Sequence, residues 1–272
     1  MTIGFIGAGT MASAIVAGII ERGVVAPDDV VVHDPHGAAS AALAASLGVR
    51  VADSNEALVD AVDTVVLAIK PQVFSEVLPP LASALAENGT LVVSIAAGTS
   101  LARIASLLGE HGAAQPVVRV MPNVNAQIGA GMAAVAGNSV ASEAQVAEVV
   151  DLFRAVGDAI ELPESSFSTF TAIAGSAPAY AFLFIDALAR GALKAGMPKA
   201  LATRIAAQTV LGSAQMILES GEHPWTLVDK VCSPGGTTLA GLMALEDGGF
   251  VSTVVDSVSA TIERDLELGA GS

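Results

Sequence analysis

The N-terminal residues include a glycine-rich loop whose spacing suits a dinucleotide. Gly7-Ala8-Gly9-Thr10-Met11-Ala12 follows an apolar run directly and opens an Ala-rich helical stretch. In this G-x-G-x-x-A pattern the first glycine permits a tight turn and the second lets the backbone approach a pyrophosphate. The free amides at the helix start would receive the anion. A glycine-rich turn in some other α/β protein is the plainer interpretation. We favour a cofactor site at Gly7, Ala8, Gly9, Thr10, Met11 and Ala12.

The residues after the second predicted strand bear on which nicotinamide cofactor binds. They read His33-Asp34-Pro35-His36. A carboxylate about 20 residues beyond the glycines usually bonds the ribose 2′-hydroxyl and would repel a 2′-phosphate, so Asp34 favours NADH. Protonated His33 or His36 could donate to a phosphate and favour NADPH. A solvated loop without a binding role is a third interpretation, and the sequence leaves the preference open.

Two later strand ends are predicted to hold the nicotinamide end of the cofactor. Ala68-Ile69-Lys70 ends one predicted strand, and Ala96-Ala97-Gly98 ends the next. In open α/β sheets, ligands lie outside the carboxyl ends of the strands, near the switch in strand order. Lys70 is one of only four lysines, and we expect it to have an electrostatic or positioning role.

A second chemical loop lies in the C-terminal half. Ser233-Pro234-Gly235-Gly236-Thr237-Thr238 directly precedes a helical pattern. Such a turn presents backbone N–H groups, and the helix dipole adds partial positive charge at the same place. Ser233, Thr237 and Thr238 would add hydroxyls, so the loop suits a small carboxylate. An ordinary helix corner with Thr237 or Thr238 as N-cap explains the same residues about equally well.

The sequence supports neither a nucleophilic catalytic residue nor a metal site. Cys232 has no assignable base, and Ser176 lacks both a G-x-S-x-G elbow and a partner base, so we expect neither to act as a nucleophile. The histidines, the cysteine and the carboxylates show no metal-ligand spacing. We therefore predict no metal site.

The elements that must position these loops change character along the chain. The first half alternates apolar strand-like runs with helical patterns, which predicts an α/β fold with a doubly wound parallel sheet of the Rossmann type. Strands are expected at Thr2–Ile6, Asp29–His33, Thr64–Ile69, Thr90–Ile95 and Val117–Met121, and helices at Thr10–Glu21, Gly37–Leu47, Val73–Ala86 and Leu101–Leu108. A further strand at Val135, a helix over Glu143–Val156 and a strand over Ala159–Leu162 would close the sheet.

The second half is predicted to be entirely helical. Helices are expected at Phe167–Ala195, Lys199–Ser220, Trp225–Val231, Thr238–Glu246 and Phe250–Leu268. We therefore divide the chain into a dinucleotide-binding domain, 1–162, and a helical domain, 163–272.

Composition narrows the class of protein. The 272 residues are 53% hydrophobic, which excludes disorder, and the single cysteine excludes a disulfide scaffold. Asp and Glu outnumber Lys and Arg by 27 to 12, for a net charge of −15, so we expect no nucleic-acid partner.

The uncharged stretch Ser165–Ile185 is about long enough to cross a bilayer, but its Ser and Thr residues, Gly175 and Pro178 argue against a span. We expect no membrane association, a cytoplasmic protein, and a subunit interface over the surplus apolar surface.

The blocks together resemble the pyrroline-5-carboxylate reductase family along essentially the whole chain. The Ser-Pro-Gly-Gly-Thr-Thr block is the most specific of them. The others are Phe5–Gly9, Lys70–Val73, Val93–Gly98, Met121–Asn123, Gly175–Phe182, the residues from Asp229 up to that block, and Leu245–Phe250.

The resemblance implies a reaction, an assembly and residue roles. The family reduces 1-pyrroline-5-carboxylate to L-proline with NADPH or NADH, the last step of proline biosynthesis. Its helical domains form a homodimer, and dimers often assemble into decamers. By resemblance the substrate carboxylate would rest on Ser233, Gly235, Gly236 and Thr237, the catalytic Thr238 would meet the ring nitrogen, and Asn123 would join the cofactor residues. The partner subunit's dinucleotide-binding domain would supply the cofactor.

The chain departs from the family pattern at three places. Family members usually carry glycine where this chain has Ala177, Thr-Pro where it has Val124-Asn125, and Asn or Gln at Thr10.

Two functions are alternatives to the family's reaction. A 3-hydroxyacid dehydrogenase would need a catalytic lysine on the first long helix of its second domain, and no lysine lies between Lys70 and Lys194. A non-catalytic dinucleotide-binding protein would have no use for the Ser233–Thr238 loop.

Overall fold

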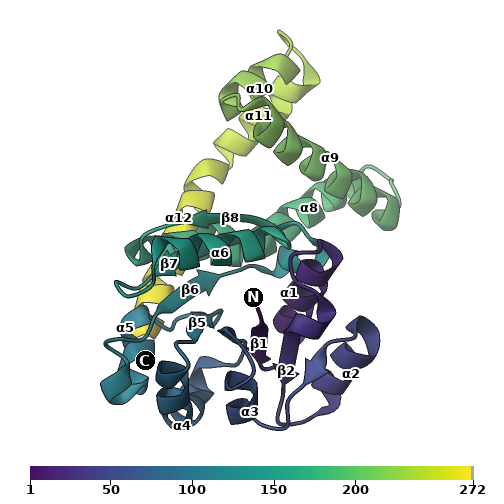
Figure 1. The fold of residues 1–272 in the computed structure, drawn as a ribbon. Coiled ribbons are helices and arrows are strands. Elements are labelled where there is room, and N and C mark those ends of the chain that lie inside the picture. Colours follow the sequence, from purple (N-terminus) through teal and green to yellow (C-terminus); the bar gives the residue numbers. More distant parts are fainter. Residues whose placement is uncertain (271–272) are drawn as a thin grey trace. The chain divides into compact units, whose positions relative to one another are not determined.

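The computed structural model describes residues 1–270, which form two compact units (Figure 1). The first comprises Met1–Gly175 together with the C-terminal residues from Thr261, and the second is Ser176–Ala260. The boundary expected from the sequence, after residue 162, falls inside the first unit.

The first unit is built on one eight-stranded sheet with the strand order β3-β2-β1-β4-β5-β6-β7-β8. Its strands are β1 (Ile3–Ile6), β2 (Val30–His33), β3 (Arg50–Val51), β4 (Thr64–Leu67), β5 (Leu91–Ser94), β6 (Val117–Met121), β7 (Gly131–Gly137) and β8 (Gly157–Glu161). The strands from β3 to β6 are parallel, whereas β7 pairs antiparallel with β6 and parallel with β8. The predicted α/β fold is confirmed, with a sheet that is mostly rather than wholly parallel.

Helices cover both faces of this sheet, and each face has its own hydrophobic core (Figure 1). The helices of the unit that precede β8 are α1 (Thr10–Glu21), α2 (Ala38–Leu47), α3 (Asn55–Val59), α4 (Phe74–Glu87), α5 (Leu101–Leu107) and α6 (Glu143–Arg154). Neighbouring residues of one strand contribute to opposite cores: Val66 packs in the core with α1 and α6, and Val65 in the core with α4. This alternation follows from the two-residue period of a strand, and it explains why the central parallel strands are mostly apolar.

The sequence did not predict β3 and α3. Strand β3 has only two residues, both exposed, and α3 has five. Elements this short show no readable hydrophobic period. Helix α3 begins where the hydroxyl of Ser54 accepts the N–H of Ala57 at 3.1 Å, a local capping bond.

The predicted long helix over Phe167–Ala195 is wrong in one respect, because it is interrupted. It begins as α7 (Phe167–Phe170), continues as a π-helical segment over Thr171–Ser176, and only then becomes α8 (Ala177–Lys194). Pro178 has no N–H to donate to the carbonyl four residues earlier, that of Ala174. The side-chain amide of Asn123 donates to that carbonyl instead, at 3.0 Å.

The second unit is helical, as predicted. After α8 it contains α9 (Lys199–Ser220), α10 (Pro224–Val231), α11 (Thr237–Asp247) and the first part of α12 (Phe250–Ala270). Many of its large apolar side chains are exposed, among them Phe182, Leu183, Leu211, Leu218 and Val255. The run Glu164–Lys194 has the length and apolar composition of a membrane span, and only 17% of its most apolar window is buried within the chain.

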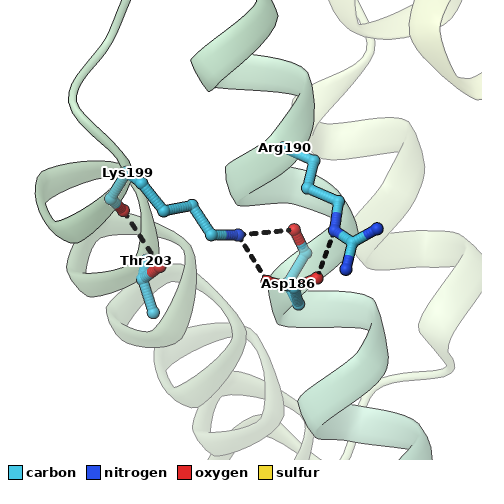
Figure 2. A network of polar contacts seen from close by, with 4 residues as sticks. All are labelled: Asp186, Arg190, Lys199 and Thr203. Atoms are coloured by element: carbon cyan, nitrogen blue, oxygen red, sulfur yellow. Dashed lines mark hydrogen bonds and ion pairs between the residues drawn. The ribbon is translucent and has the colours of Figure 1, made fainter.

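A charged cluster joins α8 to α9 (Figure 2). Asp186 on α8 accepts the Nε of Arg190 at 2.5 Å and the Nζ of Lys199, the first residue of α9. Lys199 also donates to the backbone carbonyl of Asp186 at 3.3 Å. The hydrogen bond from Lys199, with the help of Arg190, lowers the pKa of the Asp186 carboxyl.

This cluster predicts an acid-sensitive contribution to the stability of the helical hairpin. Because the pKa of Asp186 is lower in the folded state, the contribution is present above the ordinary carboxyl pKa and is lost as pH falls through the folded value. Asp186→Asn should lower Tm by roughly 1–4 °C at neutral pH and by much less in acid. The control is Asp256→Asn on α12, an exposed carboxylate. Equal Tm values for the two variants at neutral pH would contradict the assignment.

Candidate functional site

The glycine loop after β1 has the geometry that an anion requires. Gly7 has φ +99°, and a Cβ at this position would lie 2.6 Å from the Ala68 carbonyl oxygen. A Cβ on Gly9 would meet nothing within 4 Å, so open space lies beside it. Gly9 is also the N-cap of α1 and provides no side-chain cap to its first turn. The amides of that turn are therefore available to a ligand.

Some backbone amides of this loop are hydrogen-bonded within the protein, and the others are open to a ligand. The N–H of Gly7 donates to the His33 carbonyl at 2.8 Å, and that of Ala8 donates to the Asp34 carboxylate at 3.2 Å. These two amides hold the turn against β2, so the amides from Gly9 onward are the ones open to an anion. Ala8 and Ala12 are buried in the core, which shows why small residues are needed there.

The loop after β2 is ordered by hydrogen bonds. Asp34 is half-buried, and its second carboxylate oxygen accepts the N–H of His36 at 3.0 Å. The Nδ1 of His33 lies 2.9 Å from the Ala52 carbonyl oxygen. Since a carbonyl only accepts, Nδ1 carries the proton in this contact. The imidazole of His33 is thus directed to β3 by its own bond.

The two strand ends predicted for the nicotinamide lie at the same edge of the sheet as the glycine loop. Ile6 is in register with Leu67 of β4, and Leu67 with Ser94 of β5. The residues that follow, from Gly7, Ala68 and Ile95, therefore leave the sheet side by side. Beyond them Lys70 and Ala97 are exposed, Ile69 and Gly98 are half-buried, and Ala96 is buried.

Asn123 is placed differently from what its predicted role suggests. Its side chain is buried and bonded at both ends within the protein: Nδ2 donates to Ala174, and Oδ1 accepts the N–H of Met132 at 3.1 Å. The side chain thus holds the end of β6 to the π-helical segment. A contact between Asn123 and a cofactor would have to come from its backbone.

Sequence reasoning missed a partly buried ion pair behind the Gly98 loop. Arg119 on β6 donates from Nη1 to Glu164 Oε1 at 2.9 Å, and its guanidinium lies 4.6 Å from the centre of the Phe167 ring. The same Glu164 oxygen accepts the N–H of Leu101, the first residue of α5, at 2.8 Å. The pair thus ties the chain just after Gly98 to β6. A single arginine inside the apolar strand Val117–Met121 was the available signal.

The Arg119–Glu164 pair predicts a large loss of stability on truncation. The Arg119 side chain is 9% exposed and that of Glu164 is 30% exposed. Removing one partner leaves the other charge unpaired, so Arg119→Met should cost about 2–4 kcal/mol of unfolding free energy. In denaturant unfolding, the exposed Arg103→Met serves as the control and should change little. A loss with Arg119→Met no larger than with Arg103→Met would contradict the proposed tie.

The Ser233–Thr238 loop of the second unit leads into α11 without a side-chain cap. Gly236 is the N-cap residue and Thr237 is already helical, so the structure differs from the alternative in which Thr237 or Thr238 serves as N-cap. The N–H of Gly236 donates to the Ser233 carbonyl at 2.9 Å and closes the turn. Gly236 therefore shapes the loop, and the amides of Thr237 and Thr238 are among those left to a ligand. The side chains of Ser233, Thr237 and Thr238 are exposed, and Cys232 is half-buried.

The fold and the two loops identify the class of protein before any comparison with known families. A doubly wound sheet with an uncapped, glycine-led helix at its switch point, joined to a helical unit, is the plan of a nicotinamide-dependent oxidoreductase. Residues 2–98 match the family model "NADP oxidoreductase coenzyme F420-dependent", and residues 164–268 match "Pyrroline-5-carboxylate reductase dimerisation". Among residues 1–270, no group of side chains could hold a metal ion.

Similar proteins cover the whole chain. The pyrroline-5-carboxylate reductase of Synechocystis sp. is 43% identical over 98% of both chains. The enzyme of Escherichia coli K12 is 40% identical over 98% of this chain and 97% of its own. The structure of the Coxiella burnetii enzyme superposes with a TM-score of 0.93 at 34% identity, over 98% of both chains. The chain belongs to the pyrroline-5-carboxylate reductase family.

One solved relative bears on the cofactor. The structure of the Plasmodium falciparum pyrroline carboxylate reductase, described with NADP bound, has a TM-score of 0.86 and 29% identity over 99% of this chain and 98% of its own. This chain is an NAD(P)H-dependent oxidoreductase of the same family. The predicted class of enzyme is confirmed, and the non-catalytic alternative is wrong.

Proposed function

We propose that this enzyme reduces the C=N bond of 1-pyrroline-5-carboxylate to give L-proline, the final step of proline biosynthesis. The observation that carries the proposal is the uncapped start of α11 at Gly236, in a chain whose full-length relatives are reductases of this substrate. Residues 1–162 would bind the dinucleotide, and residues 163–272 would bind the substrate and form the dimer. The alternative function, that of a 3-hydroxyacid dehydrogenase, requires a catalytic lysine that this chain lacks between Lys70 and Lys194.

The cofactor fits the first unit because a cradle exists where its pyrophosphate would lie. Open space beside Gly9 and the uncapped first turn of α1 provide that cradle. The residues proposed to bind the cofactor are Gly7, Ala8, Gly9, Thr10, Met11, Ala12, His33, Asp34, Ala68, Ile69, Lys70, Ala96, Ala97, Gly98 and the backbone of Asn123. When bound, NAD(P)H supplies the hydride.

The Ser233–Thr238 loop would hold the substrate. The amides of Thr237 and Thr238 and the Ser233 hydroxyl receive the carboxylate, while Gly235 and Gly236 keep side chains out of its way. The Thr238 hydroxyl meets the ring nitrogen and supports positive charge there, which makes the neighbouring carbon more electrophilic. A strong protein acid is unnecessary, because an imine is far more basic than a ketone. Catalysis is then mostly orientation, which can recover roughly 7–11 kcal/mol of a barrier.

A second copy of the chain would cover the exposed apolar faces of α8, α9 and α12. The dimerisation family model spans these helices, which supports a protein partner over a lipid surface. We further propose that the dimer is cytoplasmic and can assemble into decamers. In this dimer, the partner's dinucleotide-binding domain would supply the cofactor to each Ser233–Thr238 loop. Light scattering after gel filtration without detergent should give a dimer or a multiple of it. A monomer, or aggregation that only detergent relieves, would contradict this assembly.

The reaction itself is tested by loss of nicotinamide absorbance with 1-pyrroline-5-carboxylate. We expect substrate-dependent oxidation of the reduced cofactor and formation of L-proline. Proline-dependent reduction of the oxidised cofactor at alkaline pH provides the reverse test. A purified, folded dimer inactive in both directions would overturn the proposed function.

A further inference from the structure

The carboxylate of Asp34 is fixed beside the loop that would hold the cofactor. One oxygen accepts the N–H of Ala8 at 3.2 Å, and the other accepts the N–H of His36 at 3.0 Å. Ala8 lies between the two glycines of the loop, so the first bond joins the carboxylate directly to that turn. An ionised carboxylate accepts about four hydrogen bonds. Asp34 therefore keeps acceptor capacity for hydroxyl donors after binding both amides.

Acidic groups predominate around Asp34. Asp53 and Glu56 follow β3, the strand beside β2. The pKa of the Glu56 carboxyl is lowered by its own backbone N–H, by the Ser54 hydroxyl and by the nearby His33. His33 thus has an acidic neighbour as well as its bond to the Ala52 carbonyl.

Cations that could bind a phosphate lie elsewhere. The loop 33–37 contains no lysine or arginine. Arg50 on β3 is in register with Val31, three residues before Asp34, which places its backbone about 10 Å back along the strand from the sheet edge. His36 is exposed, and its contact with Asp34 is made by the backbone amide. A 2′-phosphate normally needs an arginine near this position.

We propose that Asp34 selects NADH over NADPH in this enzyme. Its carboxylate accepts the 2′-hydroxyl of the adenosine ribose, and its negative charge repels a 2′-phosphate. The inference rests on the proposed function only in placing the dinucleotide at the glycine loop. A preference of at least tenfold for NADH is expected.

Binding of AMP and of 2′,5′-ADP to the full-length protein tests this inference without the reaction. 2′,5′-ADP is AMP with a second phosphate on its 2′-oxygen, so the two probes differ only in the 2′-phosphate. Neither contains a nicotinamide, so calorimetric titration reports on the adenosine end alone. The wild type should bind AMP at least tenfold more tightly than 2′,5′-ADP. Asp34→Asn removes the charge with little change of shape and should reduce that ratio to within about threefold of one.

Asp53→Asn is the matched control, because Asp53 is an exposed carboxylate that adds to the negative charge around Asp34 without a bond to the glycine loop. It should change the ratio far less than Asp34→Asn does. A wild type that binds 2′,5′-ADP as tightly as AMP, or binds neither probe, would overturn the inference. The inference would also be overturned if Asp53→Asn changed this ratio as much as Asp34→Asn does. Reduction of 1-pyrroline-5-carboxylate, measured separately, shows whether the proposed function survives such a result.

Discussion

Gly236→Ala is expected to raise KM for 1-pyrroline-5-carboxylate by at least tenfold while the affinity for the cofactor stays the same. Gly236 has φ −76°, so alanine is conformationally acceptable there. The added Cβ would lie 2.4 Å from the Ser233 Oγ and 3.0 Å from the Ser233 carbonyl oxygen. The shorter contact forces the Ser233 hydroxyl to rotate away from its present position, and the longer one displaces the Ser233 carbonyl that closes the turn by a few tenths of an ångström. Steady-state kinetics with varied substrate measures the change.

The same helix provides the control for this substitution. A Cβ on Gly241, within α11, would meet nothing within 4 Å. Gly241→Ala should leave KM unchanged and slightly stabilise the helix, because alanine is favoured over glycine in a helix interior by roughly 0.5–1 kcal/mol. If Gly236→Ala had wild-type KM, or if both variants raised KM equally, the loop would not be the carboxylate receptor.

Thr238→Ala is expected to lower kcat by about 100-fold or more, the usual effect of losing a group that supports proton transfer. Thr238 lies in the first turn of α11, and its side chain is exposed. The hydroxyl is the group proposed to meet the ring nitrogen, whereas the backbone amide at this position remains in the variant. The loss should therefore appear in kcat more than in KM, and the cofactor should bind as before.

Thr238→Ser separates a chemical role from a structural one. Serine keeps the hydroxyl and loses only a methyl group, so kcat should recover to within about tenfold of the wild type. Binding of NADH and NADPH, followed by fluorescence, confirms that each variant has an intact first unit. Wild-type turnover in Thr238→Ala would remove this hydroxyl from the mechanism.

The sequence predicts most of the sheet because each parallel strand is buried on both faces. Runs such as Thr64–Leu67 and Leu91–Ser94 are apolar or nearly so, and all of their residues are buried. The glycine spacing likewise predicts the start of α1, since local backbone geometry sets the requirement at Gly7. These signals are local, so they can be read from a few consecutive residues.

The remaining features depend on contacts between distant parts of the chain. Asn123 and Ala174 are 51 residues apart in sequence, and Arg119 and Glu164 are 45 apart. No local pattern pairs them, and the predicted helix Phe167–Ala195 runs unbroken through Pro178. The sequence also gave no means of knowing that the Gly236 amide closes its own turn. It therefore located the loop correctly in the chain without showing which of its amides are available.

A crystal structure of the dimer with L-proline and oxidised cofactor would test the proposed substrate site most directly. We expect the proline carboxylate within about 2.7–3.2 Å of the amides of Thr237 and Thr238. We also expect the ring nitrogen at the Thr238 hydroxyl and the reacting carbon against the nicotinamide. Proline bound away from the Ser233–Thr238 loop, or a loop out of reach of the nicotinamide, would contradict the proposed site.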